Sequence, residues 1–234
     1  MKKKSFLSFD IELLNNQIGN NQIPAVGVVT GVINEDGEFK IKDRKTFYGK
    51  INYNEVELSD FWKENIKVLK KSQLNAVSQK QMARQINGYI IKQQIDYPDL
   101  IITSDFGSFD IAELNNLFKT HGLRPLRYRR NAKEGFFMDL DLTSFAAGYL
   151  FSLDPKNSLK EGWEWGLYKK IFEKVKLDVK NEFNHDHNPV NDASKNLFEF
   201  LTLLKFGMNK KRKRKEEDKK ESRPKKRFKY CNII

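Results

Sequence analysis

The chain has 234 residues and a formal net charge of +12, from 43 Lys and Arg against 31 Asp and Glu. This length suffices for a buried core in one or two domains, and 39% hydrophobic residues with 18 Phe exclude a fully disordered protein. A single Cys excludes an internal disulfide. The sequence contains no run of about 18 apolar residues, so no membrane-spanning helix is predicted. Acidic residues interrupt the N-terminal segment, so we expect no signal peptide and an intracellular, non-secreted protein.

The positive charge is concentrated at the C-terminal end. Residues 208–234 contain 13 Lys and Arg against 4 Asp and Glu, a net charge of +9, whereas residues 1–207 carry only +3. Like charges at this density repel one another. We therefore expect a folded domain over residues 1–207 and a basic tail over 208–234 that is disordered when free.

Two basic clusters in this tail, separated by an acidic spacer, resemble a bipartite nuclear import signal. The clusters comprise Lys210, Lys211, Arg212, Lys213, Arg214 and Lys215, and then Lys225, Lys226 and Arg227. The pattern predicts a nuclear or nucleocytoplasmic protein with a nuclear import receptor as a partner. A nonspecific tail that binds polyanions is the alternative, and both could hold.

The first part of the chain predicts three strands. Residues 5–11 alternate in polarity and are rich in Phe, residues 25–33 are rich in Val, and apolar residues continue a third strand over 39–47. An Asp-Gly pair within 34–37 suits a hairpin turn between the second and third strands. These strands should form an antiparallel meander.

Helices and short strands alternate over the rest of the domain. Helices are predicted over 59–66, 78–96, 109–121, 141–151 and 163–175, and from Asn191 onward, where Ala193, Leu197, Phe200, Leu201 and Leu204 should be buried. Short strands are predicted over 100–102 and 136–140. The order predicts an α/β fold in which a mixed sheet is flanked by helices.

Two acidic residues, Asp10 and Glu12, stand at the end of the first strand. Residues two apart on a strand point to the same face, so their carboxylates should repel one another unless a cation lies between them. A hard divalent cation such as Mg²⁺ or Mn²⁺ satisfies that requirement. A solvated strand end is the alternative.

A third carboxylate, Asp110, follows the short strand at 100–102 and opens a helix. It could complete a metal site, or it could simply interact favourably with the helix dipole. Asp105 competes for the same role because it lies at the end of the strand.

His187, in a predicted loop, lies five residues before Asp192, which stands at the start of the last predicted helix. Taken alone, Asp192 could cap that helix and His187 could be a surface residue. The nearby His185 leaves open a two-histidine metal site, although carboxylates dominate the remaining candidates.

These segments, in this order, resemble the DEDDh 3′-to-5′ exonucleases of the ribonuclease H-like superfamily. The motif residues are Asp10 and Glu12 (Asp-x-Glu), Asp110 (Phe-Asp at the head of a helix), and His187 with Asp192 (His, four residues, then Asp). The motifs are separated by about 100 and 80 residues. Three weak motifs in the right order are a fairly strong signal together.

The resemblance covers residues 5–206 and looks closest to the branch of mycobacterial polyadenylate-specific exoribonucleases and phage exonucleases. That branch has a tryptophan in the helix after the third strand, where this chain has Trp62. It also has an Asp-x-x-Thr-like segment before a helix, which residues 139–143 match.

The resemblance implies a ribonuclease H-like five-stranded sheet and phosphodiester hydrolysis with two divalent metal ions, Mg²⁺ or Mn²⁺. Asp10, Glu12, Asp110 and Asp192 would hold the ions, and His187 would act as general base. The products would be nucleoside monophosphates released from single-stranded or 3′-overhanging nucleic acid. The resemblance slightly favours RNA over DNA as the substrate and leaves DNA open. It also makes a homodimer a possible assembly.

Substrate contacts are expected at a basic run that contains an aromatic residue. The candidates are Arg127, Arg129 and Arg130, together with Phe106 and Ile11 near the metal-binding motifs. An exposed strand with solvated charges is the alternative for the run, and core packing is the alternative for Phe106. A catalytically inactive nucleic-acid- or protein-binding module, and an endonuclease of the same broad fold, remain as other functions.

Overall fold

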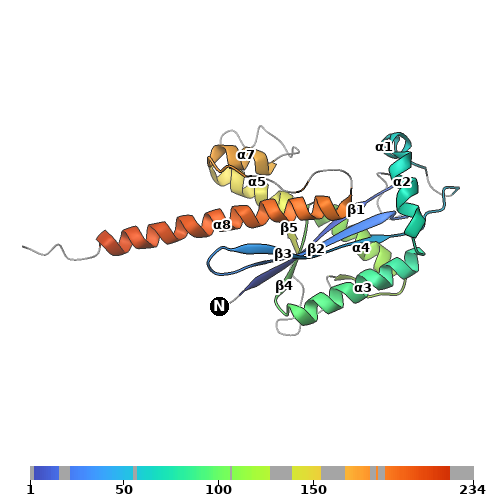
Figure 1. Ribbon diagram of the computed structural model, residues 1–234, viewed down its shortest axis with the longest axis horizontal. Coiled ribbons are helices and arrows are strands. Elements are labelled where there is room, and N and C mark those ends of the chain that lie inside the picture. Colours follow the sequence, from blue (N-terminus) through green and yellow to red (C-terminus); the bar gives the residue numbers. More distant parts are fainter. Residues whose placement is uncertain are drawn as a thin grey trace, which may run out of the picture.

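A computed structural model describes residues 3–15, 22–54, 57–105, 107–126, 139–153, 167–179, 183 and 188–221. At its centre lies a five-stranded sheet with the strand order β3-β2-β1-β4-β5 (Figure 1). The strands are β1 (Lys4–Glu12), β2 (Ala25–Ile33), β3 (Phe39–Tyr48), β4 (Leu100–Ser104) and β5 (Asp139–Asp141). The first three strands are antiparallel, β4 pairs with β1 in parallel, and β5 pairs with β4 in parallel. This arrangement confirms the predicted meander and mixed sheet.

The meander forms because its residues suit a buried, pleated surface. Every residue of the Val-rich β2 is buried, as befits a strand covered on both faces. Gly37 adopts a φ of 79° at the turn into β3, which is the conformation that the Asp-Gly pair predicts. A β-bulge between Thr30 and Gly31 shifts the register with β3.

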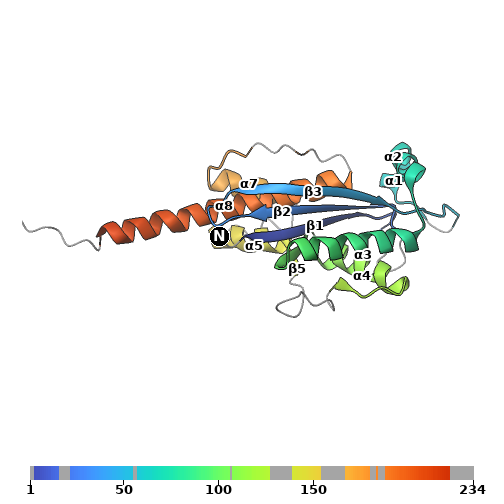
Figure 2. The ribbon, with the colours of Figure 1, turned by 60° about the horizontal axis from the view of Figure 1, so that its bottom comes forward.

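Helices cover both faces of the sheet (Figure 2). On one face α3 (Gln79–Asp96) and α4 (Gly107–Thr120) pack against Leu7 and Phe9 of β1. On the other face, α5 (Leu142–Leu153), α7 (Leu167–Lys174) and α8 (Pro189–Glu221) form a second core with Phe6. Consecutive residues of β1 therefore serve opposite cores, since side chains alternate along a strand.

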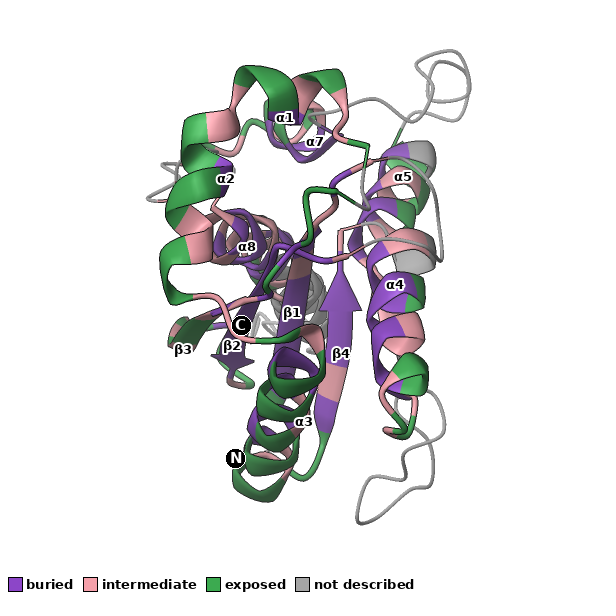
Figure 3. Ribbon diagram, turned by 90° about the vertical axis from the view of Figure 1, so that its right-hand side faces the viewer, coloured by how far each residue is buried: buried purple, intermediate pink, exposed green. Residues whose placement is uncertain are grey.

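A third, smaller core lies beyond β3, under the short helices α1 (Asp60–Glu64) and α2 (Ile66–Ser72) and the 3₁₀ turn η1 (Gln73–Asn75). The hydroxyl of Ser59 accepts a hydrogen bond from the backbone N–H of Trp62 at 3.4 Å and so caps α1, as predicted. The Trp62 indole is buried against Leu14 and Leu69. Figure 3 shows these two helices standing at one end of the buried strands β1 and β4.

The last helix begins at Pro189, close to the predicted start, but departs from the prediction in two ways. It buries Leu203 rather than the partly buried Leu204, and it continues without interruption to Glu221. A helix thus occupies residues 208–221, where a disordered segment was expected, and it extends well past the sheet (Figure 1). No helix in the described part of the chain is both long enough and apolar enough to cross a membrane.

Candidate active site

Three elements bring acidic side chains together at one end of the sheet. Asp10 and Glu12 lie at the end of β1, Asp110 in the first turn of α4, and Asp192 in the first turn of α8. Carboxylate oxygens of Asp10, Glu12 and Asp192 all lie within 4.8 Å of one another. The two acids of β1 and the acid 180 residues later in the sequence therefore form one cluster.

A glycine permits this approach. Gly27 of β2 pairs with Asp10 in the sheet, and a methyl group on Gly27 would overlap the backbone of Pro189 and Val190. Because Gly27 has no side chain, the start of α8 rests directly on the sheet beside Asp10. Asp192 follows one turn later and faces the β1 carboxylates.

Burial and like charge shape the electrostatics of the cluster. The pKa of Asp10 is raised well above its usual range, mainly by burial and next by the neighbouring carboxylates Asp110 and Glu12. Burial, followed by the charge of Asp192, raises the pKa of Glu12 to about 8. Burial and mutual repulsion therefore both disfavour the charged forms of Asp10 and Glu12.

This donor set fits divalent cations. Clustered carboxylate oxygens are the ligands that Mg²⁺ and Mn²⁺ prefer, and a bound cation removes the repulsion that raises these pKa values. Asp110 is buried, and among neighbouring charges it has the largest effect on the pKa of Asp10, so it lies in the same electrostatic site. Asp10, Glu12, Asp110 and Asp192 are thus the residues that could hold metal.

Asp105, the alternative to Asp110 as a metal ligand, is hydrogen-bonded to α5. Its carboxylate accepts a hydrogen bond of 2.9 Å from the Thr143 hydroxyl, and its carbonyl accepts one of 3.1 Å from the Thr143 N–H. Asp141 caps α5, because its carboxylate accepts a hydrogen bond from the Ser144 N–H at 2.6 Å. The Asp105 contacts join the end of β4 to α5, and the Asp141 cap fixes the start of α5 at the end of β5.

The side chain of Ile11 is buried in the core under α3 and α4, on the face opposite to Asp10 and Glu12. Its expected contact with substrate stays a prediction. The other expected site residues, His187, Phe106, Arg127, Arg129 and Arg130, lie outside the described residues.

A cavity of about 300 Å³ beside Glu12 was not foreseen from the sequence. It lies between the start of α8, at Asn188, and the helices α1 and α2. Its lining includes Trp62, Lys71 and Leu74, of which Leu74 is 81% exposed. An isolated exposed leucine carries no local sequence signal, so only the tertiary structure could bring it beside the carboxylates.

Solved structures share this architecture. The crystal structure of cell-death related nuclease 4 (CRN-4) matches with a TM-score of 0.59 and 13% identity, covering 88% of this chain and 64% of that one. Exonuclease I, in the structure that suggests how processivity is achieved, matches with a TM-score of 0.56 and 13% identity, over 86% of this chain and 40% of that one. Escherichia coli exonuclease I in complex with a dT13 oligonucleotide matches with a TM-score of 0.56 and 12% identity, over 87% and 40%.

The fold is that of the ribonuclease H-like exonucleases. The chain spans less than two thirds of the length of each of these structural relatives. No protein-family model matches the sequence. No curated protein matches it either.

Proposed function

We propose that this protein is a metal-dependent 3′-to-5′ exonuclease that releases nucleoside monophosphates from single-stranded or 3′-overhanging nucleic acid. The observation that carries the proposal is the convergence of Asp10, Glu12 and Asp192, whose carboxylate oxygens lie within 4.8 Å of one another on a ribonuclease H-like exonuclease fold. We slightly favour RNA over DNA, because the motifs of the sequence resemble those of a branch that acts on RNA.

Asp10, Glu12, Asp110 and Asp192 would hold two Mg²⁺ or Mn²⁺ ions. When bound, such ions acidify the attacking water and offset the charge that develops on the leaving 3′ oxygen. His187 would accept the proton from the attacking water as general base. Asp105 would act indirectly by holding the end of β4 against α5, and Asp141 by capping α5 at the end of β5.

The cavity beside Glu12 supports an exonuclease because it provides a bounded space next to the reacting centre. Its volume of about 300 Å³ is at the small end of ligand pockets, which suits one nucleotide rather than a continuous duplex. One structural relative, exonuclease I of Escherichia coli, has been solved with a dT13 oligonucleotide. We propose that this cavity accepts the 3′-terminal nucleotide of a single strand.

The decisive experiment uses matched RNA, single-stranded DNA and duplex DNA, each labelled at the 5′ or the 3′ end. With Mg²⁺ or Mn²⁺, the wild-type protein should produce a ladder from the 3′ end and mononucleotides. Asp10→Ala should abolish both, and EDTA should do the same to the wild type. Binding without cleavage would instead favour the inactive nucleic-acid-binding module, and cleavage of a circular single strand would favour an endonuclease.

The basic segment at residues 208–234 supports a separate proposal, that it directs the protein to the nucleus through an import receptor. Deletion of residues 208–234 should abolish nuclear accumulation of a fluorescent fusion. Unchanged accumulation would contradict an import signal, and the segment would then be a polyanion-binding extension. A homodimer is a further proposal, which the molar mass in solution tests.

A further inference from the structure

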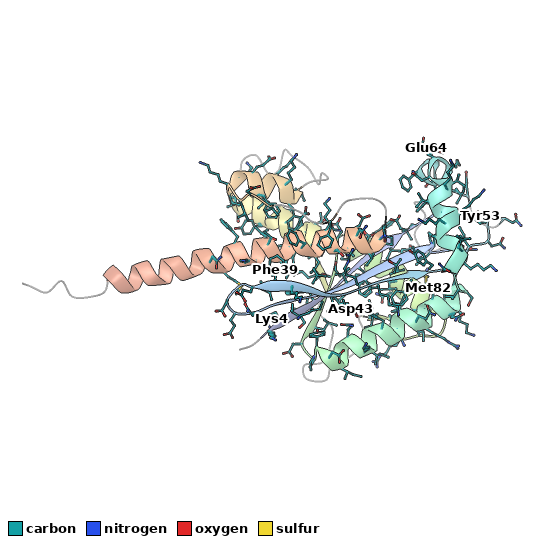
Figure 4. All side chains as sticks on the ribbon, in the orientation of Figure 1. Lys4, Phe39, Asp43, Tyr53, Glu64 and Met82 are labelled. Atoms are coloured by element: carbon teal, nitrogen blue, oxygen red, sulfur yellow. The ribbon has the colours of Figure 1, made fainter. Side chains whose placement is uncertain are left out.

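Arg44 of β3 lies at the junction between the sheet edge and the first turn of α8. Its guanidinium donates a hydrogen bond of 2.5 Å to the side-chain oxygen of Asn191. The guanidinium carbon also lies 4.9 Å from the centroid of the Phe183 ring. Phe39 and Asp43, labelled in Figure 4, mark the course of β3 below α8, and Arg44 follows Asp43.

The two partners of Arg44 belong to the same part of the molecule. Asn191 directly precedes Asp192 in the first turn of α8. The Phe183 ring packs edge-on against Phe198 of α8, with centroids 6.0 Å apart. Arg44 therefore contacts α8 directly through one partner and indirectly through the other.

Hydrogen bonds within the first turn of α8 fix its local geometry. Asn188 accepts hydrogen bonds from the N–H groups of Asn191 at 2.7 Å and of Asp192 at 3.1 Å. These bonds fix the turn relative to α8 itself. The hydrogen bond from Arg44 ties the turn to a different element, the edge strand β3.

We propose that Arg44 is a positioning residue that holds Asp192 in register with Asp10 and Glu12 and thereby sets the affinity of the carboxylate cluster for divalent cations. The inference rests on the proposed metal-dependent function and assigns a role to a residue remote from the metal ligands in sequence. Residues that orient metal ligands from behind typically contribute about 10- to 100-fold to metal affinity. The loss of one ordered contact should shift the carboxylate of Asp192 rather than unfold the domain.

The test measures Mn²⁺ binding by titration calorimetry on the metal-free full-length protein, without any substrate. Arg44→Met should weaken Mn²⁺ binding about tenfold, and Asn191→Ala should weaken it similarly. In the double variant the effects should not add, because both changes remove the same contact. Arg44→Lys, which retains a donor and a positive charge, should restore part of the affinity. Lys40→Met removes an equal charge from an exposed position of the same strand and should leave the affinity unchanged.

Activity gives a second readout that separates positioning from substrate contact. If Arg44 acts through Asp192, excess Mn²⁺ should restore the kcat of Arg44→Met, and the KM for the oligonucleotide should stay near that of the wild type. A raised KM with unchanged Mn²⁺ affinity would overturn the inference in favour of a phosphate contact. Unchanged Mn²⁺ affinity with a lowered melting temperature would also overturn it. Mn²⁺ binding that survives Asp10→Ala would instead overturn the proposed metal site itself.

Discussion

Gly27 and Pro189 lie in direct backbone contact across the interface between β2 and α8. A methyl group placed on Gly27 would overlap the carbonyl carbon and oxygen of Pro189. Gly27 also pairs with Asp10 in the sheet, so the closest approach of α8 to the sheet occurs beside the first catalytic candidate. The spacing of the carboxylate cluster therefore depends on the absence of a side chain at one position of β2.

Gly27→Ala should disrupt this interface. The overlap is with backbone atoms and cannot be relieved by a rotamer change, so α8 must shift away from β2, at a cost of about 1–3 kcal/mol or more in the free energy of unfolding. The shift also moves Asp192, so Mn²⁺ affinity should fall. Denaturant unfolding and calorimetry measure the two effects.

Gly88→Ala is the matched control for this change. An added methyl group at Gly88 in α3 would meet no atom within 4 Å, and alanine favours a helix over glycine by about 1 kcal/mol. This variant should be as stable as the wild type or more stable, with unchanged metal affinity. Equal effects at Gly27 and Gly88 would contradict the close-approach argument.

Asp10→Asn should stabilise the metal-free protein while it abolishes activity. The amide keeps the shape of the carboxylate but removes one of several mutually repelling charges in a buried site. We expect the free energy of unfolding in EDTA to rise by about 1 kcal/mol. The stabilisation by Mg²⁺ that we expect for the wild type should be absent from this variant.

The control for this prediction is Asp99→Asn, an exposed acid that precedes β4 at the other end of the strand. It should change neither stability in EDTA nor the response to Mg²⁺. A destabilised Asp10→Asn protein would show that Asp10 is held by favourable contacts rather than strained by repulsion.

The metal-free protein should lose stability as the pH rises from about 4.5 to about 8. Glu12 has a pKa of about 8 in the folded protein and 4.5 in the unfolded chain, so between these values the folded state retains a proton that the unfolded state has released. Unfolding then releases a proton, and a higher pH favours unfolding. Urea titrations in EDTA at pH 5, 6.5 and 8 measure this decline.

Two further samples identify the group that causes this loss of stability with rising pH. Glu12→Gln should remove much of the pH dependence, because the amide does not titrate. Saturating Mg²⁺ should reverse the trend in the wild type, since metal competes with the proton and binds more tightly as the pH rises. A pH dependence that is the same in Glu12→Gln would assign the decline to other groups.

Leu74→Ser should raise the KM for a short single-stranded oligonucleotide. Leu74 is 81% exposed at the rim of the cavity beside Glu12, where an apolar side chain can pack against a terminal base. Loss of one such contact should raise KM about threefold to tenfold, with little change in stability. Steady-state kinetics on a hexanucleotide measure it. The control is Ile95→Ser, because Ile95 on α3 is similar in size to leucine and is 74% exposed. This variant should leave KM unchanged, and an equal rise in KM would show that the cavity does not bind substrate.

Much of the fold follows from local sequence patterns. The observed bounds of β2, Ala25–Ile33, agree with the predicted strand because a Val-rich run followed by an Asp-Gly turn has few other solutions. The helix at Gln79–Asp96 begins after Ser78, whose hydroxyl accepts a hydrogen bond from the N–H of Gln81 at 3.2 Å. Such features depend on neighbours a few residues away. The full length of α8 is not predicted by the sequence, because the density of like charges within residues 208–221 favours disorder.

The sequence by itself placed Asp10 and Glu12 on one face through the two-residue period of a strand, and its resemblance to the DEDDh motifs added Asp192 at a helix start. Only the tertiary structure decided how closely they meet. That distance depends on contacts between segments about 150 residues apart, Gly27 with Pro189 and Arg44 with Asn191. Local patterns carry no information about such contacts, because whether α8 touches β2 is set by the volume of the side chains between them and not by the propensity of either segment.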